Sequence, residues 1–321
     1  MEPVLGMSFI WWMGVVESRQ DPKKVGRCRV RIVGSHTESK AQIPTDDLPW
    51  AQPLLPVNDS SSLQIKEGDY VVGFYLDGEN AQTPIIMGIV PGIPTVRPPS
   101  SEGFSDPRTG AELSSAPKKP GATATRNPIG LNESTLSRLA RNEKISDTQI
   151  QTKKDNAVNG VVVAGVGGTS WSEPKTPYAA TYPYNRVMET ESGHVLEFDD
   201  TPGAERVHIY HRSGTFTEVH PDGTQVIHVA ADAYEVVLSD KKIYVKGELD
   251  ITALTNINIK AGLNVNIEAG GDIVLNATKS VMTQAGVLQS HTSGGPMSLT
   301  GIPMNLNGPP GPILPPPAPV T

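Results

Sequence analysis

The sequence predicts an all-β protein with a closed barrel at its N-terminus, an antiparallel β collar in its middle and an intertwined triple-stranded β-helix at its C-terminus. Three observations lead to this prediction. Short runs of β-branched and aromatic residues alternate with Gly- and Pro-containing turns and lack a helical period. Pro-Gly, Ser-Gly and Asp-Gly turns separate period-two runs in the middle of the chain. From residue 245 onward the sequence repeats every eight residues.

Composition and charge narrow the classes of protein that fit. Apolar residues make up 37% of the 321 residues, whereas Gly (31) and Pro (29) are abundant, so part of the chain is compact and part is linker or fibrous. Cys28 is the only cysteine, which excludes an intramolecular disulfide framework and a CxxC metal site. The net charge of -7 opposes non-specific binding to nucleic acid, and no apolar run is long enough for a transmembrane helix.

Residues 1–97 are predicted to form a small barrel. Strand-like runs lie at 8–18, 26–34, 70–76 and 85–90, and turns such as "DPKKV" separate them. Short strands with Gly and Pro between them favour a closed all-β unit.

A basic stripe follows the second of these runs. Arg27, Arg29 and Arg31 alternate with apolar residues, so the three arginines share one face of a strand. Two interpretations stay open, a solvated strand face and a surface that docks on an acidic partner protein. Nucleic-acid binding is not expected, because the segment carries more acidic than basic residues and the adjacent Trp11 and Trp12 point to opposite faces.

Residues 98–180 are predicted to be a linker, because Pro, Ser and Gly dominate and no period is visible. One short helix is predicted within it at about 132–144, where Asn132 precedes a short apolar stripe. The glycine-rich run at 161–171 lacks the Gly-Lys-Ser/Thr of a phosphate-binding loop, so no nucleotide site is expected there.

Residues 181–244 are predicted to form the antiparallel collar. After His194, four further histidines lie in this region: His208, His211, His220 and His228. Because no cysteine or helix-borne carboxylate accompanies them, they are predicted to be surface or interface residues rather than metal ligands. No GxSxG motif is present, so a Ser-His-Asp triad is not expected.

Residues 245–300 divide into blocks of eight. The fifth and seventh positions of each block are mostly aliphatic, the even positions are mostly polar, and small residues stand near the block start. An extended chain with this pattern has one apolar and one polar face. The residues that we predict to form the core are Leu249, Ile251, Ile257, Ile259, Val265, Ile267, Ile273 and Leu275.

One such block cannot enclose a core by itself, because it extends over only about 26 Å at full length. Three chains can enclose one if each contributes one face per block, so that the apolar side chains meet on a shared axis. We therefore predict a homotrimer in which three chains intertwine into a triangular prism. A single-chain solenoid and an amyloid-like stack of strands are the alternatives.

The octad pattern weakens toward the C-terminus, where Thr283, Gln289 and His291 occupy inward positions. In a trimer, three copies of His291 would converge on the axis, where either a metal ion or a hydrated polar layer is expected. No other cofactor is predicted. Residues 301–321 are rich in proline, which cannot sustain ladder hydrogen bonds, so the rod is predicted to end there.

Together, the barrel, the collar and the octad tail resemble the central spike of contractile phage tail baseplates. The related VgrG spikes of type VI secretion share these parts. The collar is the most specific segment, with "EFDDTPGAERVHIYHRSG" at 197–214 followed by "HPDG" at 220–223. The resemblance covers roughly 1–97 and 185–300.

The resemblance implies that the barrel has an OB fold, that the protein is a homotrimer and that it lies in the tail baseplate of a virion. It implies that the barrel docks on a trimeric hub protein, for which Arg27, Arg29 and Arg31 are the candidate residues. It also implies that the β-helix transiently pierces the host outer envelope when the sheath contracts. The Pro-rich tail is a candidate seat for a separate tip-capping protein.

Some members of this family carry a lysozyme domain between barrel and rod, whereas the interval 98–180 is shorter than such a domain needs. It offers four glutamates but no compact fold to hold two of them at glycosidase distance: Glu102, Glu112, Glu133 and Glu143. We therefore predict no catalytic residues and no enzymatic activity. The alternatives are a tail-associated cell-wall hydrolase with a fibrous tail, a type VI secretion spike and a host-receptor fibre.

Overall fold

The computed structural model describes residues 10–58, 65–92, 103–104, 136–137, 139–141, 161–298 and 300. The chain divides into two compact units, residues 1–254 and 255–321. Apart from short 3-10 turns, the regular structure in the described residues is β, and no helix among them is long and apolar enough to cross a membrane. The predicted helix at 132–144 and the Pro-rich tail lie largely or wholly outside these residues.

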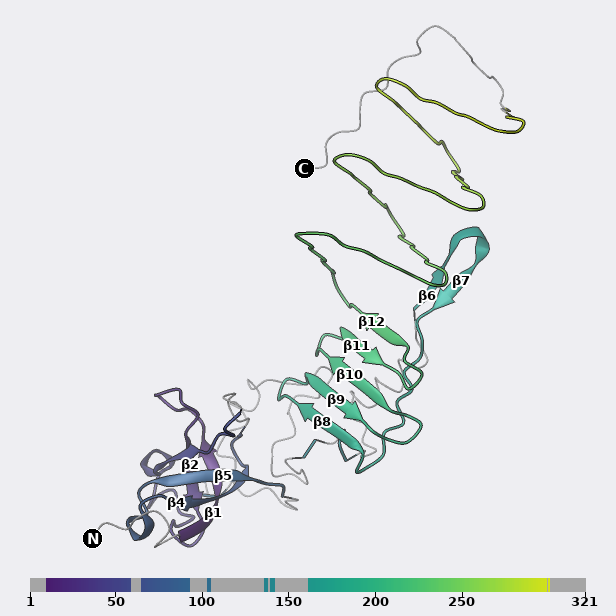
Figure 1. Cartoon of the computed structure of the whole chain (residues 1–321). Helices are drawn as coiled ribbons and strands as arrows, with labels where there is room; N and C mark the ends of the chain where they lie inside the picture. The colour runs from purple at the N-terminus through teal and green to yellow at the C-terminus, as the bar shows by residue number, and fades with distance from the viewer. Residues whose placement is uncertain are drawn as a thin grey trace. The chain divides into compact units, whose positions relative to one another are not determined.

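The N-terminal strands close into a barrel, as Figure 1 shows. They are β1 (Ile10–Ser18), β2 (Cys28–Ile32), β3 (Trp50–Pro53), β4 (Tyr70–Tyr75) and β5 (Pro84–Val90). The pairing order is β1-β2-β3-β5-β4, with β4 paired back to β1, and only β3 and β5 are parallel. The predicted closed barrel is therefore confirmed. β3 was not predicted, because a run of four residues that ends in proline gives no strand pattern.

The interior of the barrel is apolar and closely packed. Val16, Val30, Ile32, Val71 and Ile86 are fully buried in one cluster. Two strands approach so closely at Gly73 that a Cβ there would lie 1.9 Å from the carbonyl oxygen of Ile85.

A second sheet of five antiparallel strands forms the collar (Figure 1). Its strands are β8 (Asn185–Glu189), β9 (Val195–Asp199), β10 (Arg206–Tyr210), β11 (Phe216–Val219) and β12 (Gln225–His228), in the order β12-β11-β10-β9-β8. The turns at Gly203, Gly214 and Gly223 have φ of 78°, 100° and 84°, which glycine adopts without strain. The predicted antiparallel hairpins are confirmed, and β8 adds a strand that was not predicted.

An ordinary antiparallel sheet buries its apolar face and exposes its polar face. In the collar sheet the apolar face is exposed and the charged face is covered. The exposed face carries five large apolar residues, which we call the apolar sheet face: Met188, Phe198, Val207, Ile209 and Ile227, each 38–67% exposed. Cross-strand pairs such as Val207–Phe198 and Ile209–Leu196 make these residues contiguous. The opposite face is charged and is covered by other parts of the chain.

A two-stranded hairpin precedes the collar. It consists of β6 (Val162–Ala164) and β7 (Ser170–Ser172), joined by a 3-10 turn at Val166–Gly168. Gly167 and Gly168 have φ of 68° and 86°, so the turn uses the freedom of glycine. The glycine-rich run at 161–171 thus forms a hairpin in a region where the sequence predicts a linker.

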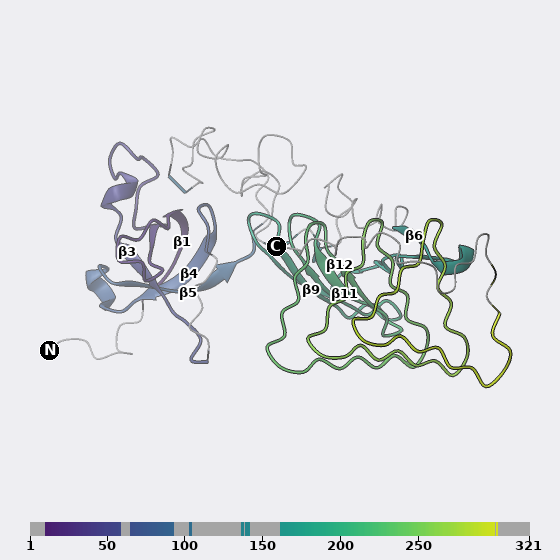
Figure 2. The same cartoon turned by 90° about the horizontal axis from the view of Figure 1, so that it is seen from above.

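The C-terminal part of the chain bends with a strict period. The bends lie at 230–231, 238–239, 246–247, 254–255, 262–263, 270–271, 278–279, 286–287 and 294–295, which is a spacing of eight residues. This spacing matches the sequence octads and begins before the predicted start at 245. Between the bends the chain has no backbone partner that would define a strand. Figure 2 shows successive passes of residues 255–298 as a series of similar loops.

Candidate functional site

The eight predicted core residues of the octads are exposed in the single chain. The fifth-position residues Leu249, Ile257, Val265 and Ile273 are 57–61% exposed, and the seventh-position residues Ile251, Ile259, Ile267 and Leu275 are 66–78% exposed. The chain therefore presents a row of aliphatic side chains that its own folding leaves in solvent. Burial of this row by further copies of the chain remains a prediction.

Nothing within the same chain requires glycine at the octad bends. A Cβ added at Gly262, Gly270, Gly271 or Gly286 would meet no atom within 4 Å, and none of the four adopts a left-handed φ. Neither the backbone conformation nor a neighbour in the same chain thus requires a small residue at these bends.

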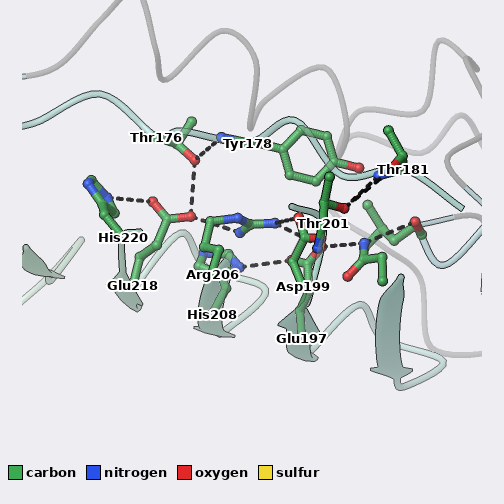
Figure 3. Close-up of polar contacts among 12 residues, drawn as sticks. Thr176, Tyr178, Thr181, Glu197, Asp199, Thr201, Arg206, His208, Glu218 and His220 are labelled. Carbon is green, nitrogen blue, oxygen red and sulfur yellow. Dashed lines mark hydrogen bonds and ion pairs between the residues drawn. The ribbon is translucent and has the colours of Figure 1, made fainter. Parts of the chain in front are cut away.

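The covered face of the collar sheet holds a buried ion network, which Figure 3 shows around Arg206. The Nη1 of Arg206 donates to Oε1 of Glu218 at 2.8 Å, and its Nη2 lies 2.9 Å from Oε1 of Glu197. The carboxylate of Asp199 lies farther from Nη2, at 4.0 Å. Arg206 and these three carboxylates are at most 3% exposed. Burial opposes the charge of Arg206, but Glu197 and Glu218 outweigh it and raise the pKa of the guanidinium.

Two histidines belong to this network. Nδ1 of His208 lies 3.5 Å from Oε2 of Glu197, and Nε2 of His220 lies 3.2 Å from Oε2 of Glu218. Both histidines are buried. The prediction of surface or interface histidines is therefore wrong for these two, because each pairs with a glutamate under a covering segment that sequence parity does not reveal. The rings of His194 and His211 lie 4.5 Å apart, and His211 is exposed.

A strap, residues 173–181, covers the network (Figure 3). The hydroxyl of Thr176 donates to Oε1 of Glu218 at 3.0 Å, and the backbone N–H of Thr181 donates to the hydroxyl of Thr201 at 3.0 Å. The ring of Tyr178 lies over Arg206, with 4.8 Å between the guanidinium carbon and the ring centre. Burial raises the pKa of Tyr178 to about 12, so its hydroxyl is neutral at physiological pH.

The network holds the strap on the sheet through the hydrogen bond of Thr176 and the contact of Tyr178 with Arg206. Among the residues that the structure describes, no group of three or more His, Cys, Asp or Glu could hold a metal ion. A short piece of the interval before the strap also packs on this face, since Leu139 is buried next to Val195. The amide Nδ2 of Asn185 donates to the carbonyl of Leu139 at 3.2 Å.

The predicted basic stripe of the barrel is largely neutralised by its surroundings. Arg31 is 0% exposed, and its Nε donates to Oε1 of Glu17 at 2.6 Å. Arg31 therefore does not belong to an exposed docking stripe, because the loop after β2 and the carboxylate of Glu17 enclose it. Arg27 pairs with Asp21 at 2.7 Å and holds the pKa of that carboxyl well below its usual range. Arg29 stacks on Trp50 at 4.4 Å.

His291 lies in an exposed polar group of its own chain. The amide Nε2 of Gln289 lies 3.0 Å from Nε2 of His291, and it donates to the hydroxyl of Thr283 at 2.6 Å. The residues that break the apolar pattern thus contact one another. A metal ion at this level stays a prediction, since it would require three copies of the chain.

Comparison with known proteins identifies relatives that match parts of this chain. The Gp5 N-terminal OB domain family matches residues 34–161. The chain is 38% identical over 282 residues to Protein Gp5 of Vibrio phage KVP40, covering 77% of this chain and 63% of that protein. It is 42% identical over 78 residues to the pre-baseplate central spike protein Gp5 of Enterobacteria phage T4, covering 24% of this chain and 14% of that protein. The chain thus spans less than two thirds of the length of either relative.

The family match includes β3, β4 and β5 of the barrel. The predicted resemblance to the central spike proteins of phage tail baseplates is thereby confirmed, since the chain is similar to the Gp5 proteins and its residues 34–161 match the OB domain of that family.

Proposed function

We propose that the chain is the structural central spike of a phage tail baseplate and acts as a homotrimer. Its place is the virion, where the barrel docks on a trimeric hub protein at the end of the tail tube. When the sheath contracts, the C-terminal rod is driven through the host outer envelope. The name of the T4 relative, pre-baseplate central spike protein Gp5, supports this role.

The observation that carries the proposal is the exposed aliphatic row of the octads together with its eight-residue bends. A side chain such as Ile259 gains about 1.5–3 kcal/mol when it moves from water into a core. A monomer would lack this free energy of burial at every octad and would expose a long apolar surface that is prone to association. Three chains around one axis bury the row, and the result is an intertwined triple-stranded β-helix.

Two further features support a trimer. Small residues at the bends, such as Gly262 and Gly270, have no role in their own chain but suit the close approach of a neighbouring chain. The apolar sheet face of the collar is exposed as well, and three such faces around the same axis would form a core that continues the rod.

The role is mechanical and needs no catalysis. A rod whose three chains share one core transmits axial force without any single chain unfolding. We propose that the chain is not an enzyme, since the interval 98–180 is shorter than the lysozyme domain that some members of this family carry. A turbidity assay on purified peptidoglycan checks this point, and clearing of the suspension would contradict it.

Several partners follow from the same proposal. Of the predicted hub-docking residues, Arg27 and Arg29 are the ones that the barrel leaves partly accessible, so they are the residues that we propose to contact the hub. The Pro-rich tail would seat a tip-capping protein. The level of His291 would hold either an axial metal ion or a hydrated polar layer.

The mass of the full chain in solution tests the proposal most directly. Light scattering coupled to size-exclusion chromatography is expected to give three times the 34.3 kDa of the chain. The species should persist in mild SDS, because its core is continuous. A soluble monomer would refute the trimeric spike.

A matched pair of substitutions ties the result to the octads. Ile259→Asp puts a charge on the proposed axis and is expected to prevent assembly. Asn258→Asp, one residue earlier on the outward face, is expected to leave the trimer intact. Equal effects of the two variants would contradict the inward assignment of the odd-numbered positions.

A further inference from the structure

The outward positions of the first octads are unusually apolar. Because the octad is an even number, the residues that alternate with the predicted core keep the outward parity throughout. Five large apolar residues occupy this parity before residue 255, and we call them the outer patch: Tyr234, Val236, Leu238, Tyr244 and Leu254, each 79–100% exposed. From residue 256 to residue 272 the outward positions are Asn, Lys, Gly, Glu and Asp, and three large apolar residues follow at this parity: Val274, Met282 and Leu288. Trimer formation through the inward row would leave this patch in solvent.

The β6–β7 hairpin is a second unpartnered apolar element. Val163 lies directly opposite Trp171, and Val161 shares their face by parity. Val161 and Trp171 remain exposed in the single chain. The segment 161–172 contains no charged residue. A two-stranded hairpin is marginal by itself, so this one needs a surface to pack against.

One contact brings the hairpin to the first octads. The hydroxyl of Thr252 donates to the carbonyl of Ala164 at 3.5 Å. The hairpin is thus anchored beside the octad segment of its own chain, yet it leaves the outer patch of that chain uncovered, since Tyr244 and Leu254 are at least 90% exposed.

We propose that the hairpin of each copy packs its Val161–Val163–Trp171 face on the outer patch of a neighbouring copy. This inference rests on the trimer of the proposed function. Where three chains intertwine, their octads alternate around the axis, so an element anchored beside one chain lies next to the octads of another. The patch and the hairpin then cover each other, and three hairpins surround the base of the rod.

Cysteine cross-linking in the full chain tests the proposal. The native Cys28 is buried, and burial raises the pKa of its thiol to about 12, so it should not react with a maleimide. Ser170→Cys on the hairpin and Lys246→Cys on the outward face near Tyr244 replace exposed polar residues. A short bismaleimide is expected to link this double variant into covalent dimers and trimers on a denaturing gel.

The matched control is Ser170→Cys with Lys260→Cys, an outward position beyond the outer patch. This control is expected to give no links between copies. Each of the single cysteine variants is also expected to give none. The native mass of the parent protein distinguishes failure of the proposed trimer from failure of the hairpin packing. A monomeric parent protein would overturn the proposed trimer and this inference with it. A trimer that yields only links within one chain, or equal links in the control, would overturn the hairpin packing alone.

A second measurement does not depend on cross-linking. Trp171→Ser removes the largest apolar side chain of the hairpin, and the trimer is expected to dissociate in SDS at a lower temperature than the parent. Ser170→Ala, on the opposite face of the same strand, should leave the dissociation temperature unchanged. Equal dissociation temperatures for Trp171→Ser and the parent would contradict the packing.

Discussion

Replacement of Arg31 by Met is expected to destabilise the barrel far more than any other arginine substitution on its strand. The guanidinium donates to both oxygens of Glu17, at 2.6 and 3.2 Å, and neither side chain is exposed. It also donates to the carbonyls of Thr37 and Ile43, at 2.6 and 2.8 Å. The variant would therefore leave a buried carboxylate and two carbonyls without their donor.

The magnitude follows from these contacts. Removal of one partner of a buried ion pair costs about 3–5 kcal/mol. Glu17 would keep the hydroxyl of Thr45 at 2.7 Å and the N–H of Phe104 at 3.2 Å, which places the carboxylate near the lower end of that range. The two carbonyl hydrogen bonds add about 0.5 kcal/mol each, the lower end for a hydrogen bond, because both are only partly buried. We expect a total loss of about 4 kcal/mol in the free energy of unfolding of the barrel.

Urea unfolding followed by tryptophan fluorescence measures this loss. Trp11, Trp12 and Trp50 lie in barrel strands, and the fourth tryptophan, Trp171, is replaced by Phe in every variant so that the signal reports the barrel. With a denaturant slope of about 1.5 kcal/mol per molar urea, the midpoint should fall by roughly 2–3 M.

Two variants control the measurement. Arg29→Met, on the same strand, removes a stacking contact with Trp50 and a hydrogen bond to the carbonyl of Leu48 at the surface, and it should cost about 1 kcal/mol. Arg31→Met combined with Glu17→Met replaces the whole pair by apolar groups and should recover most of the stability. The reasoning fails if Arg31→Met and Arg29→Met shift the midpoint equally, or if the double variant is no more stable than Arg31→Met.

Three other predictions concern the barrel. Gly73→Ala should destabilise it by about 1–3 kcal/mol in the same urea assay, because the new Cβ meets the Ile85 carbonyl, whereas Gly88→Ala has open space and should be neutral. The hydrogen bond with Arg27 lowers the pKa of Asp21, so the carboxylate contributes stability that is present above about pH 4 and is lost as the pH falls further. Asp21→Asn should therefore flatten the decline of the thermal unfolding temperature between about pH 5 and about pH 2. Cys28 should resist iodoacetamide at neutral pH and react fully only in denaturant, as mass spectrometry will report; rapid native alkylation would contradict its raised pKa.

Local sequence signals predict the elements whose own residues determine them. Glycine turns such as those at Gly214 and Gly223 separate alternating runs, so the collar hairpins follow from turn chemistry. The octad bends are predictable because aliphatic and small residues recur every eight positions in the sequence. The barrel is predictable because its short strands can bury their apolar side chains only against one another.

The burial of charged residues is not predictable by the same means. Arg31 and Glu17 alternate correctly for a strand face, but the sequence does not indicate that the loop after β2 closes over them. His208 and Glu197 lie on the charged face of the collar, which would be solvent-exposed in an ordinary sheet; the strap makes it an interior. Both features depend on a connecting segment that folds over a strand face, which the alternation of residues along the strand does not indicate.

The strict spacing of the bends has a consequence for how such a protein changes length. Removal of residues 253–260, one whole octad, would shorten the repeat by one unit and leave every remaining side chain on its original side of the chain. Removal of seven residues instead would turn the following aliphatic row outward and the asparagines inward. Repeat regions of different length can therefore arise by duplication or loss of complete octads.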